Sequence, residues 1–330
     1  MSIKFISRED IIKSKSLELP KIMETIQNAF IDFYNGEILL PDKISQIFNE
    51  ESQNRINCMP STLLKQKISG VKWISVFPNN PEYYGIPNVS GLLVLSEIEK
   101  GLPIAIMEAS LITTIRTAAI GAIASKYFAK KESKIYCSIG TGEQAKMHFL
   151  SIKEVHPEIN VCKVASKTIA EEQSFIDFCK KRYPDVNFFA CKGDFEAAAL
   201  DSDIIVTAVS CQKPLLKAKT IKQGCFYCHV GGWEDEYAVP LKANKIVCDH
   251  WESVKHRSQT ISRMYKENKL KDEDIYADMA EIICGKKLAR ENDEEFIYFN
   301  SVGLSFIDIA VASAVYKDVV NNGLGKDVEI

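Results

Sequence analysis

The sequence contains no apolar run that approaches the roughly 20 residues of a membrane-spanning helix, and its first ten residues, MSIKFISRED, lack an apolar signal core. We therefore predict neither membrane insertion nor secretion, and a cytoplasmic location. Positive charge is not in excess either, because 41 lysines and arginines stand against 44 acidic residues, for a net charge of −3. This balance argues against nucleic acid or another polyanion as a partner.

Residue groups typical of metal sites are also scarce. The five histidines form no HxxxH pair, and among the ten cysteines only Cys225 and Cys228 have CxxC spacing, with no second pair of that kind. This CFYC stretch lies in an apolar, aromatic run. We therefore predict no metal site, and reduced thiols that pack as small hydrophobic side chains.

What the chain does contain is the composition of a folded protein, with 46% hydrophobic and 26% charged residues over a length of 330 that fits two domains. Residues 18–37 have the spacing of an amphipathic helix, residues 55–75 and 90–109 contain strands, and a long helix follows. From Lys134 onward, strands and helices alternate, which is typical of a parallel sheet with helices on both faces. The pattern predicts an α/β protein: a mixed first domain, a Rossmann domain and a last helix that returns to the first domain.

The stretch YCSIGTGEQAKMHF is the candidate cofactor site. It carries Gly140-x-Gly142-x-x-Ala145 between a predicted strand and a predicted helix, the context that the dinucleotide fingerprint requires. The first glycine permits the tight turn, the second lets the backbone approach the pyrophosphate, and Ala145 replaces the third glycine. Free amides at the helix N-terminus, near Thr141 and Gln144, would then bind phosphate oxygens. Glycines punctuate many other strand–helix turns, but three more such units follow here.

The second strand of this region ends in KVASKTIAEE, where an acidic residue would bind the ribose 2′-hydroxyl of NAD. Ser166, Lys167 and Thr168 stand there instead, and their charge and hydroxyl groups suit a 2′-phosphate. We predict NADP or NAD with a slight preference for NADP; the alternative is that Lys167 is a solvated surface residue. Thr207 and Ser210 follow a later strand, at the edge of the sheet where the cofactor lies in this fold.

The run PIAIMEASLITTIRTAAIGAIAS, with SGVKWIS before it and GTGEQAKMH after it, resembles the ornithine cyclodeaminase/mu-crystallin family over nearly the whole chain. Within the family, RINCMPS and SGVKWIS followed by an Asn-Pro loop are similar to the branch of N-(2-amino-2-carboxyethyl)-L-glutamate dehydrogenases. The resemblance implies a Rossmann domain at residues 130–303, a substrate-binding and dimerisation domain at residues 1–129 and 304–330, and a homodimer. It also implies NAD(P)-dependent oxidation of that substrate and hydrolysis of the imine to L-2,3-diaminopropionate and 2-oxoglutarate, for siderophores and peptide natural products.

An amino-acid substrate needs fixed cations for its carboxylates. Lys72 lies between Val71 and Trp73 on a predicted strand, where burial without an anion is costly, although the alternating pattern also allows it to face water. Arg116 is the only charge between Glu108 and Lys126, and a carboxylate suits its guanidinium; an ion pair with Glu108 is the alternative. The resemblance implies that Lys72 and Arg116 bind the substrate carboxylate.

A third cation is less clearly indicated: Arg55 and Lys43 are candidates, and either is equally a solvated surface charge. The general acid/base is a departure from the family pattern, in which an Asp follows VGG and handles the substrate amine. Alignment through PLKANKIV places Glu234 there, whereas alignment on VGG places Trp233 there with Asp235 close by. We favour Glu234, which can carry out the same proton transfer; a polar surface turn is the alternative, and the change argues against strict ornithine cyclodeaminase activity.

Three further residues have two interpretations each. Ser301 matches a family segment near the nicotinamide. Asp308 is a helix cap or an ion-pair residue, and His229 is a hydrogen-bonded strand histidine or lines the site.

Two other functions remain open. One is a ketimine or cyclic-imine reductase, or a cyclodeaminase, on the same scaffold, and an NADP preference favours the reductive direction. The other is a non-catalytic protein that binds NADPH and a ligand, as a crystallin branch of the family does; the presence of both carboxylate-binding cations argues against it.

Overall fold

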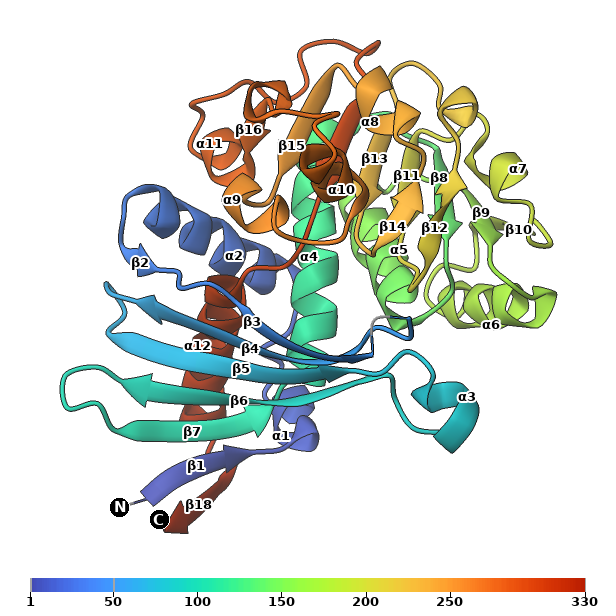
Figure 1. The fold of residues 1–330 in the computed structure, drawn as a ribbon. Coiled ribbons are helices and arrows are strands. Elements are labelled where there is room, and N and C mark those ends of the chain that lie inside the picture. Colours follow the sequence, from blue (N-terminus) through green and yellow to red (C-terminus); the bar gives the residue numbers. More distant parts are fainter. Residues whose placement is uncertain (1, 50, 330) are drawn as a thin grey trace. The chain divides into compact units, whose positions relative to one another are not determined.

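A computed structural model describes residues 2–49 and 51–329 of the chain. It contains two compact units: unit 1 comprises Met1–Arg116 and Gly303–Ile330, and unit 2 comprises Thr117–Val302 (Figure 1). The division falls inside helix α4 (Ser110–Phe128). Over the described ranges, none of the helices combines the length and the apolar character that crossing a bilayer requires.

Unit 1 is built on an eight-stranded mixed sheet in the order β18-β1-β7-β6-β5-β4-β2, with β3 paired to β4. Its strands are β1 (Ser2–Ile6), β2 (Ile38–Leu39), β3 (Ile44–Asn49), β4 (Asn54–Leu63), β5 (Ile68–Val76), β6 (Val89–Glu97), β7 (Pro103–Glu108) and β18 (Lys326–Glu329). The alternation along β5 decides the two faces, because Lys72 and Ile74 are buried while Trp73 between them is exposed.

Helices of unit 1 cover the buried face of this sheet. They are α1 (Arg8–Lys13), α2 (Leu19–Tyr34) and α12 (Ser305–Asn321), whereas the short helix α3 (Asn80–Tyr84) buries none of its residues. Helix α12 packs along β4 and β5 and against α2, whose Phe30 and Phe33 rings contact Phe306 (Figure 1). The predicted amphipathic helix at residues 18–37 is α2, and its helical spacing buries Ile22 and Ile26. Unit 1 therefore joins the first third of the chain to its last helix.

Unit 2 has an eight-stranded parallel sheet in the order β10-β9-β8-β11-β13-β17-β15-β16 (Figure 1). Its strands are β8 (Ile135–Ile139), β9 (Val161–Ala165), β10 (Asn187–Ala190), β11 (Ile204–Thr207), β13 (Phe226–His229), β15 (Lys245–Cys248), β16 (Ala277–Asp278) and β17 (Ile297–Asn300). The order reverses between β8 and β11, the switch point at which doubly wound sheets bind their ligands.

The remaining elements of unit 2 are α5 (Glu143–Val155), α6 (Ile169–Lys180), α7 (Phe195–Ala199), α8 (Ala238–Lys242), α9 (Trp251–Val254), α10 (Thr260–Lys266), α11 (Met279–Ile283), the 3-10 helices η1 (Ala218–Thr220) and η2 (Asp272–Asp274), and a small parallel pair, β12 (Gln212–Leu216) with β14 (Trp233–Asp235). The predicted fold class, a Rossmann domain with a mixed α+β domain, is confirmed.

The structure contains three features that the sequence did not predict: the position of β17, the pairing of β1 with β18, and a helix in the Asn-Pro loop. Strand β17 lies between β13 and β15 in its sheet, and in unit 1 the edge strand β18 pairs with β1, which joins the two ends of the chain. These short strands carry too few residues for a periodic pattern to identify them. The Asn-Pro loop contains a single short helix, α3, which ends at Gly85 in the left-handed conformation.

Candidate functional site

The predicted phosphate loop lies where β8 passes into α5. Gly140 has a φ of +111°, which a residue with a side chain rarely adopts, and so it makes the turn. Gly142 is the N-cap of α5 and provides no side-chain cap, so the first amides of the helix stay available. Ala145 is fully buried, as a close helix–strand contact requires, and Gln144 Oε1 is buried without a hydrogen-bond partner in the described ranges. This turn is at the switch point of the sheet and presents amides for a diphosphate.

The strand end predicted to read the ribose has a carboxylate beside its hydroxyl groups. Ser166 donates its hydroxyl to Glu171 Oε2 at 2.9 Å, and Thr168 is the N-cap of α6, reciprocally bonded to Glu171. Lys167 between them is exposed. The two hydroxyl groups thus serve the helix cap, and Lys167 is the residue of this trio that remains for a phosphate.

In unit 1, both predicted carboxylate-binding cations converge on one acidic residue. Lys72 Nζ lies 2.6 Å from Asp308 Oδ2, and Arg116 Nε donates to Asp308 Oδ1 at 2.8 Å. The exposed fractions of Lys72, Arg116 and Asp308 are 1%, 5% and 0%. Asp308 is therefore an ion-pair residue, one of its two predicted interpretations. Two cations against one anion leave a net positive charge in a buried setting, which suits one further carboxylate.

The electrostatics of this cluster weaken the lysine charge. Burial lowers the pKa of Lys72 to about 8; the negative charge of Asp308 opposes the shift, and the positive charge of Arg116 adds to it. Arg116 Nη1 is buried and has no hydrogen-bond partner among the described residues. Gly303, with a φ of +75°, makes room for the guanidinium, because a Cβ there would lie 2.6 Å from Nη1. The open Nη1 is a donor without an acceptor, as a binding site for an anion requires.

Of the two further cations considered, Arg55 lies on the same face of the sheet as Lys72. Met59 is directly opposite Lys72, and Arg55 stands four residues before Met59 on β4, so the side chains of the three share a face. Arg55 Nη1 donates to the carbonyl of Gln53 at 2.9 Å. Lys43 is half-buried just before β3.

In unit 2, the two acidic candidates form a buried cluster. Glu234 is fully buried; its Oε1 accepts from the amide of Val209 at 2.6 Å, and its Oε2 accepts from Thr207 Oγ1 at 2.6 Å and the amide of Gly231 at 2.8 Å. The carboxylate therefore ties together the turns that leave β11 and β13. The alternative interpretation of Glu234, a polar turn at the surface, is therefore wrong.

Asp235 is equally buried and has a different environment. Its Oδ1 accepts from Thr260 Oγ1 at 2.6 Å, and its Oδ2 has no hydrogen-bond partner in the described part of the chain. Burial raises the pKa of Asp235 to about 6, and the nearby His229 opposes that rise. A carboxyl group with this pKa changes its protonation state close to neutral pH.

Three other predicted cofactor residues, Thr207, Ser210 and Ser301, lie at the carboxyl edge of the same sheet and differ in burial and hydrogen bonding. Thr207 is fully buried and its hydroxyl is engaged with Glu234, while Ser210 beyond it is exposed. Ser301 is buried and donates to Asp249 Oδ2 at 3.1 Å. Of these three, only Ser210 presents its side chain openly at this edge.

Sequence reasoning missed the amides that surround this cluster. His229 Nδ1 lies 2.7 Å from Asn300 Oδ1, and Asn300 Nδ2 donates to Gln259 Oε1 at 2.8 Å. The one available signal was that His229 and Asn300 each end an apolar strand, since strand ends of a parallel sheet meet at one edge.

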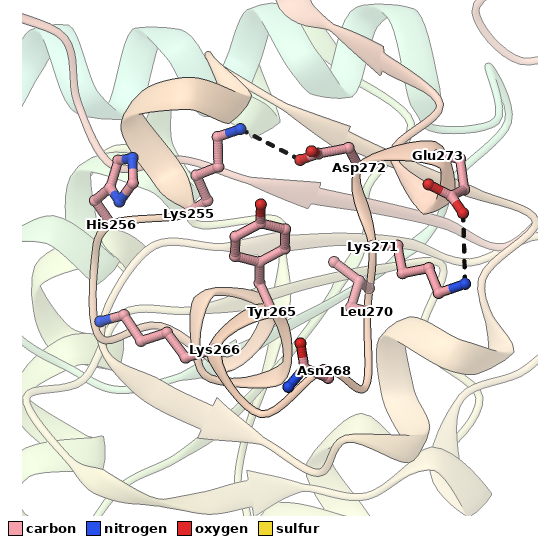
Figure 2. A pocket seen from close by; sticks show the side chains of 9 residues that line it. All are labelled: Lys255, His256, Tyr265, Lys266, Asn268, Leu270, Lys271, Asp272 and Glu273. Carbon is pink, nitrogen blue, oxygen red and sulfur yellow. Dashed lines mark hydrogen bonds and ion pairs between the residues drawn. The ribbon is translucent and has the colours of Figure 1, made fainter.

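Figure 2 shows a pocket in unit 2 that none of the predicted site residues lines. Its charged residues already have partners: Lys255 pairs with Asp272, and Lys271 with Glu273. Among the residues that the structure describes, no three His, Cys, Asp or Glu side chains are grouped so as to hold a metal ion. All ten cysteines belong to the described residues and are free thiols.

Comparison with known proteins gives the family. The sequence profile of the ornithine cyclodeaminase/mu-crystallin family matches residues 3–323. The N-((2S)-2-amino-2-carboxyethyl)-L-glutamate dehydrogenase of Staphylococcus aureus is 26% identical over 99% of this chain and 98% of its own length.

Two solved structures are similar along their whole length. The Thermococcus litoralis Δ1-pyrroline-2-carboxylate reductase, in complex with NADH and L-proline, has a TM-score of 0.93 and 30% identity, covering 99% of this chain and 100% of its own. An archaeal alanine dehydrogenase dimer with bound NAD has a TM-score of 0.91 and 29% identity, with both chains covered completely.

These relatives are dehydrogenases or reductases that act on carbon–nitrogen bonds, which confirms the prediction of an enzyme of this class with an NAD-type cofactor. The profile match extends over both units and includes the loop at Gly140, the two cations and Asp308. The chain thus belongs to the ornithine cyclodeaminase/mu-crystallin family.

Proposed function

We propose that this protein oxidises N-(2-amino-2-carboxyethyl)-L-glutamate with NAD(P)⁺ and hydrolyses the resulting imine to L-2,3-diaminopropionate and 2-oxoglutarate. The buried Lys72–Asp308–Arg116 cluster carries the proposal, because its net positive charge and the open Arg116 Nη1 suit the carboxylate of an amino acid. The similarity to the S. aureus enzyme over 99% of the chain supports this substrate among the possible amino acids.

The reaction divides into two balanced steps. The turn at Gly140 and Gly142 would hold the dinucleotide, which would supply the hydride acceptor. In the first step the glutamate α-carbon loses its hydride, the amine nitrogen loses its proton and a C=N bond forms. Water then adds to the imine carbon, and cleavage of the C–N bond releases the amine as diaminopropionate and the carbon skeleton as 2-oxoglutarate. Lys72 and Arg116 would hold the carboxylate next to the reacting α-carbon throughout, which fixes its orientation.

Glu234 is the proposed group that takes the amine proton and guides the water, with Asp235 as the alternative. The three hydrogen bonds to Glu234 favour a fixed carboxylate at this place. The unpartnered Oδ2 of Asp235, and its pKa of about 6, favour proton exchange near neutral pH. Separate Glu234→Gln and Asp235→Asn variants distinguish them, since the true acid/base loses most of kcat while the other loses less.

The test is to supply the purified protein with N-(2-amino-2-carboxyethyl)-L-glutamate and either NAD⁺ or NADP⁺ and to follow the absorbance of the reduced cofactor. We expect reduction, with diaminopropionate and 2-oxoglutarate formed in equal amounts. Absence of reduction with both cofactors would overturn the substrate assignment. The second candidate is a cyclic-imine reductase, favoured by the 30% identity to the T. litoralis enzyme, and an assay of Δ1-pyrroline-2-carboxylate with NADH and NADPH tests it.

The choice between NAD and NADP is proposed to depend on Lys167. The exposed lysine supports NADP, whereas the carboxylate of Glu171 beside Ser166 Oγ supports NAD because it would repel a 2′-phosphate. If NADP is used, Lys167→Ala should lower kcat/KM for NADP⁺ about tenfold, the worth of one charge-assisted hydrogen bond, and change kcat/KM for NAD⁺ less than about twofold. Lys180→Ala, an exposed lysine at the end of α6, is the control. Equal loss for both cofactors would contradict a role in their discrimination.

A homodimer is the proposed assembly, formed through the exposed face of the sheet in unit 1. A row of apolar side chains crosses four strands on this face, because Ile44 pairs with Cys58, Cys58 with Trp73 and Trp73 with Leu92. Ile44, Trp73 and Leu92 are 61%, 44% and 47% exposed. Such a row is unfavourable in water and suits a second copy, and the archaeal alanine dehydrogenase is a dimer.

Trp73→Glu should therefore convert the dimer to a monomer, because a buried unpaired carboxylate at the interface costs several kcal/mol. Light scattering after size-exclusion chromatography measures the mass. Leu288→Glu, at a leucine of unit 2 that is 63% exposed, should leave the dimer intact. A monomeric wild-type protein, or a dimeric Trp73→Glu variant, would contradict the proposed interface.

A further inference from the structure

His229, the last residue of β13, is fully buried, and its neighbours determine which ring nitrogen carries a proton. Gln259 Nε2 donates to the carbonyls of Gly231 and Ser301 at 2.8 and 3.0 Å, so the oxygen of the same amide must face Asn300. Asn300 therefore presents Nδ2 to Gln259 and Oδ1 to His229. Because that oxygen can only accept, Nδ1 of His229 is the protonated nitrogen.

The other ring nitrogen of His229 faces two acidic residues. Nε2 lies 3.4 Å from Glu234 Oε2 and 3.4 Å from Asp235 Oδ1, and all three side chains are fully buried. A bare Nε2 between two ionised carboxylates would leave two negative charges without compensation in a dry interior, which is costly. One further proton must therefore belong to the trio, either on Nε2 or on a carboxyl group.

Of the two carboxyl groups, Asp235 is the one that can share this proton. Glu234 receives hydrogen bonds from Thr207, Val209 and Gly231, and three donors on one carboxyl group stabilise its ionised form. Asp235 has the open Oδ2 and a pKa that burial raises to about 6. The proton therefore lies between His229 Nε2 and Asp235, and both placements leave Glu234 ionised.

The phenols and thiols around His229 do not exchange protons near neutral pH. The rings of Tyr227 and Tyr298 lie 6.1 and 6.0 Å from its ring, and burial raises the pKa of both phenols well above the usual value. Burial also raises the pKa of Cys228, and that of Cys211 to about 11; both thiols sense the charge of Glu234. These phenols and thiols therefore stay protonated near neutral pH.

We propose that His229 is a positioning residue: it shares one proton with Asp235, keeps Glu234 ionised, and thereby fixes the turns at Val209 and Gly231. These turns leave β11 and β13 at the carboxyl edge of the sheet, where this fold binds a dinucleotide. Only the link to turnover rests on the proposed function. The shared proton is a property of the folded chain and holds whatever the substrate is.

Nuclear magnetic resonance of the full-length protein with ¹⁵N-labelled histidine rings tests the shared proton without any substrate. The chain has five histidines, and His229→Gln identifies the signals of His229 by their loss. We expect Nδ1 to behave as an N–H nitrogen throughout the range from about pH 5 to 8. We also expect Asp235→Asn to shift the Nε2 signal. A bare Nδ1, or an Nε2 signal unchanged by Asp235→Asn, would overturn the pair.

The pH dependence of kcat/KM tests whether the shared proton affects turnover. If the protein does not turn over the proposed substrate, the pH dependence of NADH binding is measured instead. In His229→Gln, Asp235 loses the positive charge that opposes its protonation, so its pKa should rise. The acid limb of the pH profile should therefore move to higher pH by about one unit. In Asp235→Asn, the limb should disappear or move down. His156→Gln, a buried histidine bonded to Ser125, is the control and should leave the limb in place.

A merely structural role predicts a different result. If His229 only fills space, His229→Gln lowers kcat/KM or NADH affinity equally at every pH, and the acid limb stays where it is in the wild type. That outcome would overturn the proposal even if the histidine signals behave as expected, because the proton would then be uncoupled from the cofactor edge.

Discussion

Lys72→Met is expected to lower kcat/KM for an amino-acid substrate by at least about a hundredfold. Removing one partner of a buried charge pair with a bound ligand costs about 3 kcal/mol of binding free energy, and each 1.4 kcal/mol is a factor of ten. The cluster would change from a net positive charge to none, because Asp308 would keep only Arg116. Steady-state kinetics measure the loss, and NADH affinity, which depends on the loop in unit 2, should stay within about twofold.

The matched control is Lys65→Met, since Lys65 is an exposed lysine in the turn between β4 and β5 that pairs with Asp32. It should retain wild-type kinetics and melting temperature. Lys72 also has its own pH signature: it is charged below its pKa of about 8, so substrate KM in the wild type should rise as the pH rises through 8. A Lys72→Met enzyme with wild-type kcat/KM would contradict the assignment of this cluster to the substrate.

Gly142→Ala is expected to abolish dinucleotide binding while leaving the fold intact. Gly142 has a φ of −68°, and a Cβ at this position meets no atom within 4 Å, so the unliganded protein accommodates alanine at a cost below about 0.5 kcal/mol. The same methyl group would stand where the pyrophosphate approaches the backbone, so affinity should fall about a hundredfold or more. Fluorescence titration with NADH and thermal melting separate the two effects.

Gly140→Ala provides the contrast, because it should lose both stability and binding. Its φ of +111° is strained for alanine, and the added Cβ would lie 2.7 Å from the carbonyl oxygen of Ala208. A destabilisation of about 1–3 kcal/mol is expected from the backbone strain alone. If Gly142→Ala bound NADH normally, the diphosphate would not lie on this turn, and the site assignment in unit 2 would be wrong.

The phosphate loop and the two cations could be identified from the sequence for a local reason. A strand, two glycines and a helix within about a dozen residues fix where Gly140 and Gly142 lie, because the turn and its helix are neighbours along the chain. Lys72 and Arg116 stood out because each is a charge in an apolar element, which requires an anion when buried. Both are buried, and the anion they meet in the structure is Asp308.

The partners of these residues depend on the tertiary structure. Asp308 lies 192 positions after Arg116. The sequence predicted that the last helix returns to the first domain, but no local pattern shows that it packs on β4 and β5 with Asp308 toward Lys72 and Arg116. The order of unit 2, with β17 between β13 and β15, brings Asn300 beside His229 although 71 positions separate them. Glu234 could be chosen from the sequence only by alignment, and the fold determines its burial and its three donors.

The sequence by itself thus determined the family and the two kinds of domain, and it predicted the dinucleotide turn and the cations, because each is indicated by a pattern of residues close together in the chain. Only the tertiary structure decided that Lys72 and Arg116 share one carboxylate, and that His229, Glu234 and Asp235 form one buried group. The physical reason is that the charge state of a buried group depends on its spatial neighbours, and chain topology rather than sequence distance determines those neighbours.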